Sequence, residues 1–303
     1  MGKIHQKRSK ILIFGAGGGG MFFYEKYQDK YAVLAFIDND SNKQGEEVFG
    51  VPIIGPKNIS EYNFDKIFIV SMWSEEIERQ LRNEFEISPE KIVNLPKSKF
   101  KNGASYPFED PATLEFAGDI LLFLTDMFER EKVPYFIDHG TLLGIVRDGD
   151  IISWDDDIDI SVPARDSDRT ILLVKERINS FSATEDINWS GELLYDDVDG
   201  DLGLRLFFKE NGALRLNDFV IGISFIHFKN GVAEEYINVA PVKHFAAFQT
   251  INYKGRDLRI PQDTESYLEL HYGDWKSPKR DFSFSDIKNF KNPNAAIRKK
   301  RIF

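Results

Sequence analysis

A strand, a glycine-rich turn and a helix follow one another near the start of the chain. Residues 10–20 read KILIFGAGGGG, and the next stretch, MFFYEKYQDKY, has the apolar spacing of a helix. Three further apolar runs, AVLAFIDND, VPIIG and DKIFIVS, precede a helical stretch, SEEIERQLRNEFE. Strands that alternate with helices form a parallel sheet. This part of the chain therefore predicts a small α/β domain.

The glycines of this turn have the spacing of a dinucleotide-binding site. Gly15, Gly17 and Gly20 stand in the order G-x-G-x-x-G, and Asp38 ends the next apolar run. In such sites the glycines let a pyrophosphate approach the backbone, and the acid binds a ribose hydroxyl. We expect these four residues to bind a nucleotide-shaped ligand, with a structural or regulatory role of the domain as the alternative.

Composition excludes several classes of protein. The 303 residues include 39 Lys and Arg against 49 Asp and Glu, a net charge of −10, which argues against non-specific binding to nucleic acid. With no cysteine, disulfides and thiolate zinc sites are excluded, and the five histidines have no ligand-like spacing. The first apolar run is too short for a signal peptide, so we expect a cytoplasmic protein. The basic segment from Lys276 onward predicts a solvated tail, with peripheral contact to an anionic membrane as the alternative.

The helical and strand patterns divide the chain into two domains. Pro, Gly, Lys and Ser interrupt the patterns shortly before ATLEFAGDILLFLTDMFEREK, an amphipathic helix that VPYFIDHGTLLG follows. We therefore predict a first domain over 1–97, a linker over 98–111 and a second α/β domain with a mixed sheet over 112–303.

The most acidic stretch of the chain is DDDIDIS. Because apolar Ile158 and Ile160 alternate with acids, the segment predicts a strand on which Asp157 and Asp159 share one face, about 7 Å apart. Two such carboxylates repel each other unless a cation lies between them. Mg²⁺, with Mn²⁺ as an alternative, is the cation that carboxylates and phosphates hold together.

A second motif precedes the acids. Gly140 and Thr141 stand at a predicted strand-to-helix turn, where backbone N–H groups can bind a phosphate, and Arg147 adds a positive charge on the helix. A phosphate-binding turn followed by Asp-apolar-Asp on a strand is the layout of a nucleotidyltransferase-type site.

The stretch HGTLLGIVRDGDIISWDDDIDISV resembles the signature of the LicD/fukutin-type phosphotransferases, and RIPQDTESYLELHYGDWKSP resembles the closing segment of that family. The resemblance implies a nucleotidyltransferase-like fold, a CDP-activated alcohol as donor, a sugar hydroxyl of a glycan as acceptor, and CMP as the leaving group. It implies that Asp157 and Asp159 bind magnesium. The first domain, through FIDND and VFGVPIIG, resembles Rossmann-like modules of sugar-modifying enzymes in polysaccharide pathways.

One position departs from that family. Its members carry a further Asp on a later strand, where this chain has Gly222 in IGISFIHF. The group that completes the metal site or accepts the proton of the attacking hydroxyl is therefore open. The candidates are Asp218, Glu234, Glu235 and Asp156.

The predicted catalytic residues are Asp156, Asp157, Asp159 and Arg147. Around them, Gly140, Thr141, His139 and Trp154 are predicted to bind substrate, although packing is an alternative for His139 and Trp154. Two other functions stay open, namely a nucleotidyltransferase that releases pyrophosphate and a catalytically silent protein that binds a nucleotide-sugar.

Overall fold

The computed structural model describes residues 8–71, 73–95, 106–181, 187–196, 200–211, 214–236, 238–280, 288–289 and 299–302. The chain divides into two compact units. The first contains the elements from β1 to β6, and the second those from the 3-10 helix Pro107–Glu109 to β16. The predicted linker falls partly on residues 98–105, which lie outside the described part, while 106–111 lead into the second unit.

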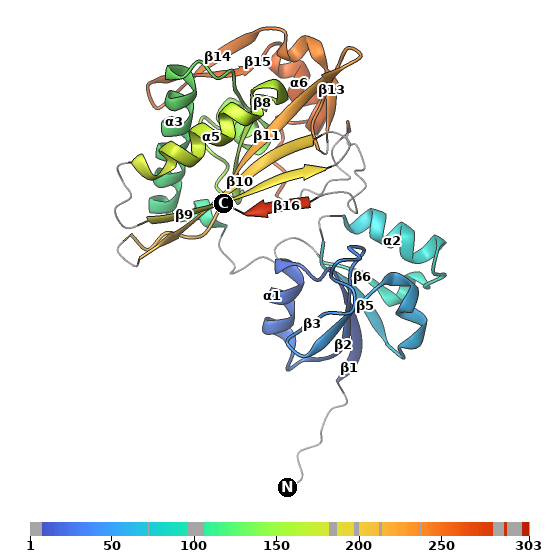
Figure 1. The fold of residues 1–303 in the computed structure, drawn as a ribbon. Helices are drawn as coiled ribbons and strands as arrows, with labels where there is room; N and C mark the ends of the chain where they lie inside the picture. Colours follow the sequence, from blue (N-terminus) through green and yellow to red (C-terminus); the bar gives the residue numbers. More distant parts are fainter. Residues whose placement is uncertain are drawn as a thin grey trace. The chain divides into compact units, whose positions relative to one another are not determined.

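The first unit is an α/β layer structure around one sheet (Figure 1). The strand order is β3-β4-β2-β1-β5-β6, and all neighbours are parallel except β3 and β4. Its elements are β1 (Ser9–Phe14), α1 (Gly18–Tyr27), β2 (Tyr31–Ile37), β3 (Glu47–Val48), β4 (Val51–Ile54), β5 (Lys66–Ile69), α2 (Ser74–Asn83) and β6 (Ile92–Asn94).

The position of β1 inside the sheet, between β2 and β5, explains why residues 11–14 are all apolar. Ile11 and Ile13 belong to a core cluster on one face of the sheet, and Leu12 and Phe14 belong to the cluster on the other. A parallel strand covered on both faces buries every side chain rather than every second one. The predicted α/β fold with a parallel sheet is confirmed for this unit.

The second unit is built around a larger mixed sheet. Its helices are α3 (Pro111–Arg130), α4 (His139–Arg147), α5 (Ser167–Arg177) and α6 (Thr264–Tyr272). Its strands are β7 (Phe136–Ile137), β8 (Asp157–Pro163), β9 (Ile187–Asp196), β10 (Gly200–Glu210), β11 (Val220–Lys229), β12 (Val232–Glu234), β13 (Val239–Pro241), β14 (Phe248–Tyr253), β15 (Arg256–Pro261) and β16 (Lys299–Ile302).

Strand β8 lies at the centre of the pairing that positions the site. It runs parallel to β11 and antiparallel to the short β7, while β11 continues into the path β13-β12-β11-β10-β9-β16. Helix α3 packs its apolar face on this sheet, and Ile120, Leu121, Leu124 and Phe128 are fully buried there. The predicted mixed α/β fold is confirmed for this unit too.

The basic C-terminal segment is not only a solvated tail, as one sequence prediction had it. Residues 299–302 form β16, an edge strand antiparallel to β9, and the guanidinium of Arg301 lies over the ring of Tyr195. Backbone pairing with β9 outweighs the tendency of a charged end to fray.

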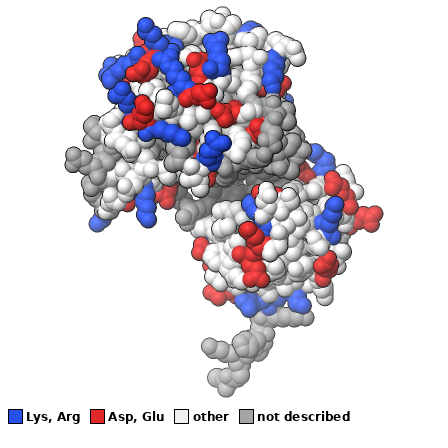
Figure 2. Space-filling view, in the orientation of Figure 1, with Lys and Arg blue, Asp and Glu red and all other residues white. Residues whose placement is uncertain are grey.

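Surface charge on the second unit is mixed. Figure 2 shows Lys and Arg side chains beside Asp and Glu side chains on its visible face. Among the ion pairs of this unit is that of Arg259 with Glu129, at 2.6 Å. Within the described residues, no helix has both the length and the apolar character needed to cross a bilayer.

Candidate active site

The acidic residues lie where β8 begins. Ile158 and Ile160 are fully buried in the core, whereas Asp157 and Asp159 are partly exposed, as the alternation of a strand requires. Asp156 precedes the strand and lies in the loop, where its orientation is not bound to that alternation. One face of β8 therefore presents two carboxylates side by side.

The first turn of α4 is fixed against Asp159. The hydroxyl Oγ1 of Thr141 accepts the N–H of Asp159 at 2.9 Å, and the N–H of Asp138 donates to the carbonyl of Asp159 at 3.2 Å. Strand β7 leads directly into this turn, as the sequence predicted. The N–H groups of Gly140 and Thr141 belong to the first helical turn, which has no acceptors four residues earlier in the helix. Such groups bind anions.

Asp155 is a site residue that sequence reasoning missed. Its Oδ2 lies 2.2 Å from the position that a Cβ on Gly140 would take, so a side chain at Gly140 would displace this carboxylate. Carboxylate oxygens of Asp155, Asp156 and Asp157 lie within 4.8 Å of one another. The signal was available, because Asp155 opens the DDD run, but the strand pattern favoured its later members.

The electrostatics of the cluster favour a bound cation. Burial and the nearby Asp157 carboxylate raise the pKa of Asp159 well above its usual value. Burial, together with Asp159 and Asp155, likewise raises the pKa of Tyr272. A carboxylate that resists ionisation for these reasons is stabilised in its charged form by a divalent ion. The donors are hard oxygen atoms, so the residues present fit Mg²⁺ or Mn²⁺.

Gly222 stands where the LicD family carries a further Asp, and it lies beside the acidic residues of β8. Gly222 on β11 pairs with Asp159, and a Cβ there would lie 3.4 Å from Asp159 Oδ1. Four residues are candidates for the role of the absent acid. Of these, Asp156 lies close to Asp155 and Asp157, and its carbonyl accepts the N–H of Val220 at 3.3 Å. Asp218 is exposed before β11 and Glu234 ends β12.

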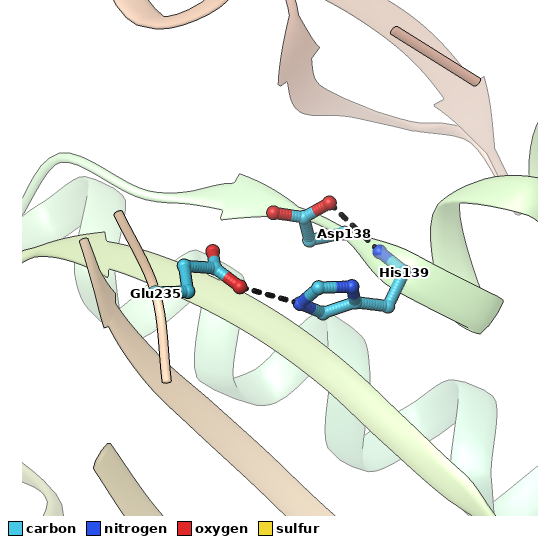
Figure 3. Close-up of side chains that lie close together, drawn as sticks. All are labelled: Asp138, His139 and Glu235. Atoms are coloured by element: carbon cyan, nitrogen blue, oxygen red, sulfur yellow. Dashed lines mark hydrogen bonds and ion pairs between the residues drawn. The ribbon is translucent and has the colours of Figure 1, made fainter. Parts of the chain in front are cut away.

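The fourth candidate, Glu235, belongs to a second, buried polar cluster (Figure 3). Its Oε2 lies 2.6 Å from Nε2 of His139, and its Oε1 lies 2.8 Å from the hydroxyl of Ser161. The same hydroxyl lies 2.8 Å from Oδ2 of Asp138, whose Oδ1 accepts the hydroxyl of Tyr267 at 2.8 Å. Sequence reasoning did not predict this cluster, because its members come from four distant segments.

The carboxylates of this cluster favour the charged form of His139. Although burial disfavours the charged imidazole, the carboxylates of Glu235 and Asp138 raise the pKa of His139 well above its usual value. Its backbone has a φ of 46°, a left-handed conformation that costs a non-glycine residue of order 1–3 kcal/mol. Asp138, the N-cap of α4, accepts the N–H of His139 at 2.8 Å and supports this conformation.

Arg147 ends α4 and lies beside Trp154. Both Nε and Nη2 of Arg147 donate to Asp148, and its guanidinium lies 5.7 Å from the ring centre of Trp154. Since Arg147 follows Thr141 by six residues, it lies about 9 Å further along the helix axis. Trp154 packs against the core of the unit. Their roles in binding substrate stay predictions.

The glycine turn of the first unit is held by contacts with other residues of the same unit. Gly15 has a φ of 115°, and a Cβ on Gly20 would lie 1.9 Å from the carbonyl oxygen of Gly15, which fixes both residues as glycine. Gly17 is the N-cap of α1 and has open space around it. Asp38 accepts the N–H of Ala16 at 3.0 Å and pairs with an ammonium, that of Lys43, at 2.9 Å. A ribose would have to share Asp38 with these groups.

Comparison with known proteins finds a family-model match within each unit. Residues 132–263 match the family model described as LicD/FKTN/FKRP, nucleotidyltransferase domain. This range includes the turn of α4, the acids of β8, Gly222 and Glu235. Residues 132–263 are a LicD-type domain. Residues 7–93 match a model described as C2185-like, N-terminal.

One curated relative is similar to about half of this chain. The protein of Mus musculus named Ribitol 5-phosphate transferase FKRP is 27% identical over 170 residues, which are 54% of this chain and 32% of that protein. The chain thus spans about a third of the length of this relative.

Solved structures match with low identity. UDP-D-quinovosamine 4-dehydrogenase from Vibrio fischeri is 20% identical over 29% of this chain and 79% of its own, with a TM-score of 0.25. The complex of ANT(2'')-Ia with adenylyl-2''-tobramycin is 14% identical over 55% of this chain and 82% of its own, with a TM-score of 0.34.

Proposed function

We propose that the LicD-type domain transfers a phospho-alcohol group, of the phosphocholine, phosphoglycerol or phosphoribitol type, from a CDP-activated donor to a sugar hydroxyl. The acceptor is a cell-surface glycan or its precursor. The single observation that carries the proposal is the contact between the first turn of α4 and Asp159, which joins an anion-binding helix start to a pair of carboxylates. The family match and the named activity of the mouse relative support this reaction class.

In this proposal Asp157 and Asp159 hold Mg²⁺ or Mn²⁺, with Asp155 and Asp156 nearby. When bound, such an ion neutralises the charge of a diphosphate and polarises its oxygens. The chain itself does the positioning. The first-turn N–H of Gly140 binds donor oxygens, and the buried Thr141 orients that turn. Arg147 adds positive charge, and Trp154 contributes an apolar surface for the donor.

The reaction exchanges one P–O bond for another. The acceptor oxygen forms a bond to the phosphorus that carries the alcohol, and the bond from that phosphorus to the bridging oxygen breaks. CMP leaves with the electron pair, and the acceptor hydroxyl loses its proton. Asp156 is the candidate base, since it precedes β8 and is free of the strand's alternation.

The first unit has a separate proposed role. Gly15, Gly17, Gly20 and Asp38 would bind a nucleotide-shaped ligand, at the open side of the turn around Gly17. The bonds of Asp38 to Ala16 and Lys43 favour a ligand that contacts the turn by phosphate rather than by ribose. Titration calorimetry of the full chain with NAD, UDP-sugars and CDP-alcohols tests this role.

Product analysis tests the transfer reaction. The full chain is incubated with CDP-ribitol, CDP-glycerol or CDP-choline, with and without a sugar acceptor, in Mg²⁺ or in EDTA, and the nucleotide products are separated. We expect Mg²⁺-dependent release of CMP. Asp157→Asn and Asp159→Asn should lower the rate by at least 100-fold, while Asp168→Asn, an exposed position on α5, should keep it.

The other outcomes identify the alternatives. Release of pyrophosphate from CTP would identify a nucleotidyltransferase and contradict the proposal. Binding of a nucleotide-sugar without turnover of any donor would identify a silent binding protein, for which Gly222 beside Asp159 would mark the lost acid.

A further inference from the structure

Glu235 was one candidate for the missing third acid, but its surroundings do not suit that role. Its side chain is 6% exposed, and both of its oxygens are engaged, one by His139 and one by Ser161. Each oxygen still has a second lone pair, but a ligand that used one would have to reach a side chain that is only 6% exposed and that already makes two short hydrogen bonds. Glu235 is therefore placed to act on other side chains of the protein.

The hydrogen-bond count of the cluster defines its state. Ser161 has one hydroxyl proton but lies 2.8 Å from both Asp138 and Glu235, so one of the two carboxyl groups must supply the second proton. Burial raises the pKa of Asp138, whereas His139 lowers the pKa of Glu235 against the effect of burial. The shortest contact of the cluster is the one between Glu235 Oε2 and His139 Nε2, at 2.6 Å.

This pair lies at the one residue of α4 that needs external support. His139 begins the helix with a left-handed backbone, and it is followed at once by Gly140 and Thr141, which meet the acidic strand. Nδ2 of Asn238 lies 3.2 Å from the other ring nitrogen, Nδ1 of His139, so the imidazole has a polar neighbour at both ends. A shift of His139 would move the first turn of α4 away from Asp159.

We propose that Glu235 is a positioning residue of the transfer site, because its contact with His139 fixes the first turn of α4 against Asp159. The proposal rests on the transfer function proposed above. It gives Glu235, which β12 delivers from a later part of the chain, a role in orienting the phosphate-binding turn.

The test compares Glu235→Gln with Glu269→Gln, a matched change at an exposed position of α6. Glu235→Gln keeps the size and the contact with Ser161 but removes the charge that pairs with His139. We expect kcat to fall about 10- to 100-fold while KM for the CDP donor changes less than about 3-fold. Glu269→Gln should keep both constants.

A double variant and an exchange measurement complete the test. If the two residues act as one unit, His139→Gln with Glu235→Gln should lose no more activity than the worse single variant. Hydrogen exchange of the Asp159 N–H, which Thr141 accepts, should accelerate at least 10-fold in Glu235→Gln and stay unchanged in Glu269→Gln. Unchanged exchange together with unchanged kcat, or losses that simply add, would overturn the positioning role.

The exchange measurement separates this inference from the proposed function. If the native protein releases no CMP from any donor but the Asp159 N–H still exchanges faster in Glu235→Gln, the transfer reaction is wrong and the structural role of Glu235 stands. If CMP is released and exchange is unchanged, the transfer reaction stands and the role of Glu235 is wrong.

Discussion

The hydroxyl of Thr141 accepts the backbone N–H of Asp159 at 2.9 Å, and this bond joins the first turn of α4 to the acidic strand β8. Thr141 is 1% exposed, so water cannot replace the bond. The contact holds a helix start that can bind phosphate beside a carboxylate that can bind a metal. The geometry of the proposed site depends on it.

Thr141→Val removes this acceptor while keeping the size of the side chain. The N–H of Asp159 would be left buried without its partner, which costs about 1–3 kcal/mol. We expect a matching loss in the free energy of unfolding, measured by urea denaturation, and a lower kcat. Thr141→Ser keeps the hydroxyl and should retain most of both. Equal stability of the Val and Ser variants would count against the role of this bond.

Gly140→Ala tests the approach of Asp155 to the turn. The new Cβ would lie 2.2 Å from Oδ2 of Asp155, so the carboxylate must move, whereas Gly222→Ala places a Cβ 3.4 Å from Asp159 Oδ1 and needs only a small adjustment. We expect Gly140→Ala to weaken Mn²⁺ binding about 10-fold or more and Gly222→Ala to weaken it far less. Calorimetric titration of Mn²⁺ measures both, and the reverse order would contradict the site.

Gly20→Ala tests the closeness of helix and strand in the first unit. Its Cβ would meet the carbonyl oxygen of Gly15 at 1.9 Å, a backbone atom that cannot move aside alone, whereas a Cβ on Gly18 meets nothing within 4 Å. We expect Gly20→Ala to lower the Tm of this unit by several degrees, or to prevent its folding. Gly18→Ala, a change that favours helix, should leave the Tm equal or slightly higher. Differential scanning calorimetry resolves the two.

The stability of the second unit should depend on pH through His271. Burial lowers the pKa of His271 to about 4, below its unfolded value of about 6.5, so the folded state favours the neutral ring. The contribution of this ring is complete above about pH 6.5 and is lost as the pH falls toward 4, by about 3 kcal/mol in total. Between pH 6.5 and pH 4, the free energy of unfolding should therefore fall by about 3 kcal/mol less in His271→Gln than in the native protein. Urea denaturation at several pH values measures the difference, and equal slopes would refute it.

Local patterns were sufficient for much of the site. The alternation in DDDIDIS placed Asp157 and Asp159 on one face of β8, and the glycine turn before α4 followed from its residue types. Both features depend on backbone geometry within a few residues, which the sequence specifies directly. The resemblance to the LicD family was likewise readable and is confirmed by the family match.

The residues that contact these segments from elsewhere in the chain could not be predicted from the sequence. Asp155 beneath Gly140, Gly222 beside Asp159, and the cluster of Glu235 with His139 arise from chain segments that come together only when the sheet forms. Likewise the sequence predicted β1 as a strand of a parallel sheet, but the two core clusters that cover its two faces are seen only in the structure.

The sequence by itself determined the two α/β units, the acidic strand and the two glycine turns, because periodicity and glycine content act through local backbone preference. The tertiary structure alone decided that Glu235 pairs with His139, that Asp38 bonds to its own glycine turn, and that residues 299–302 pair with β9. These contacts join positions far apart in the chain, and only strand register and burial select them among the many pairs that composition allows.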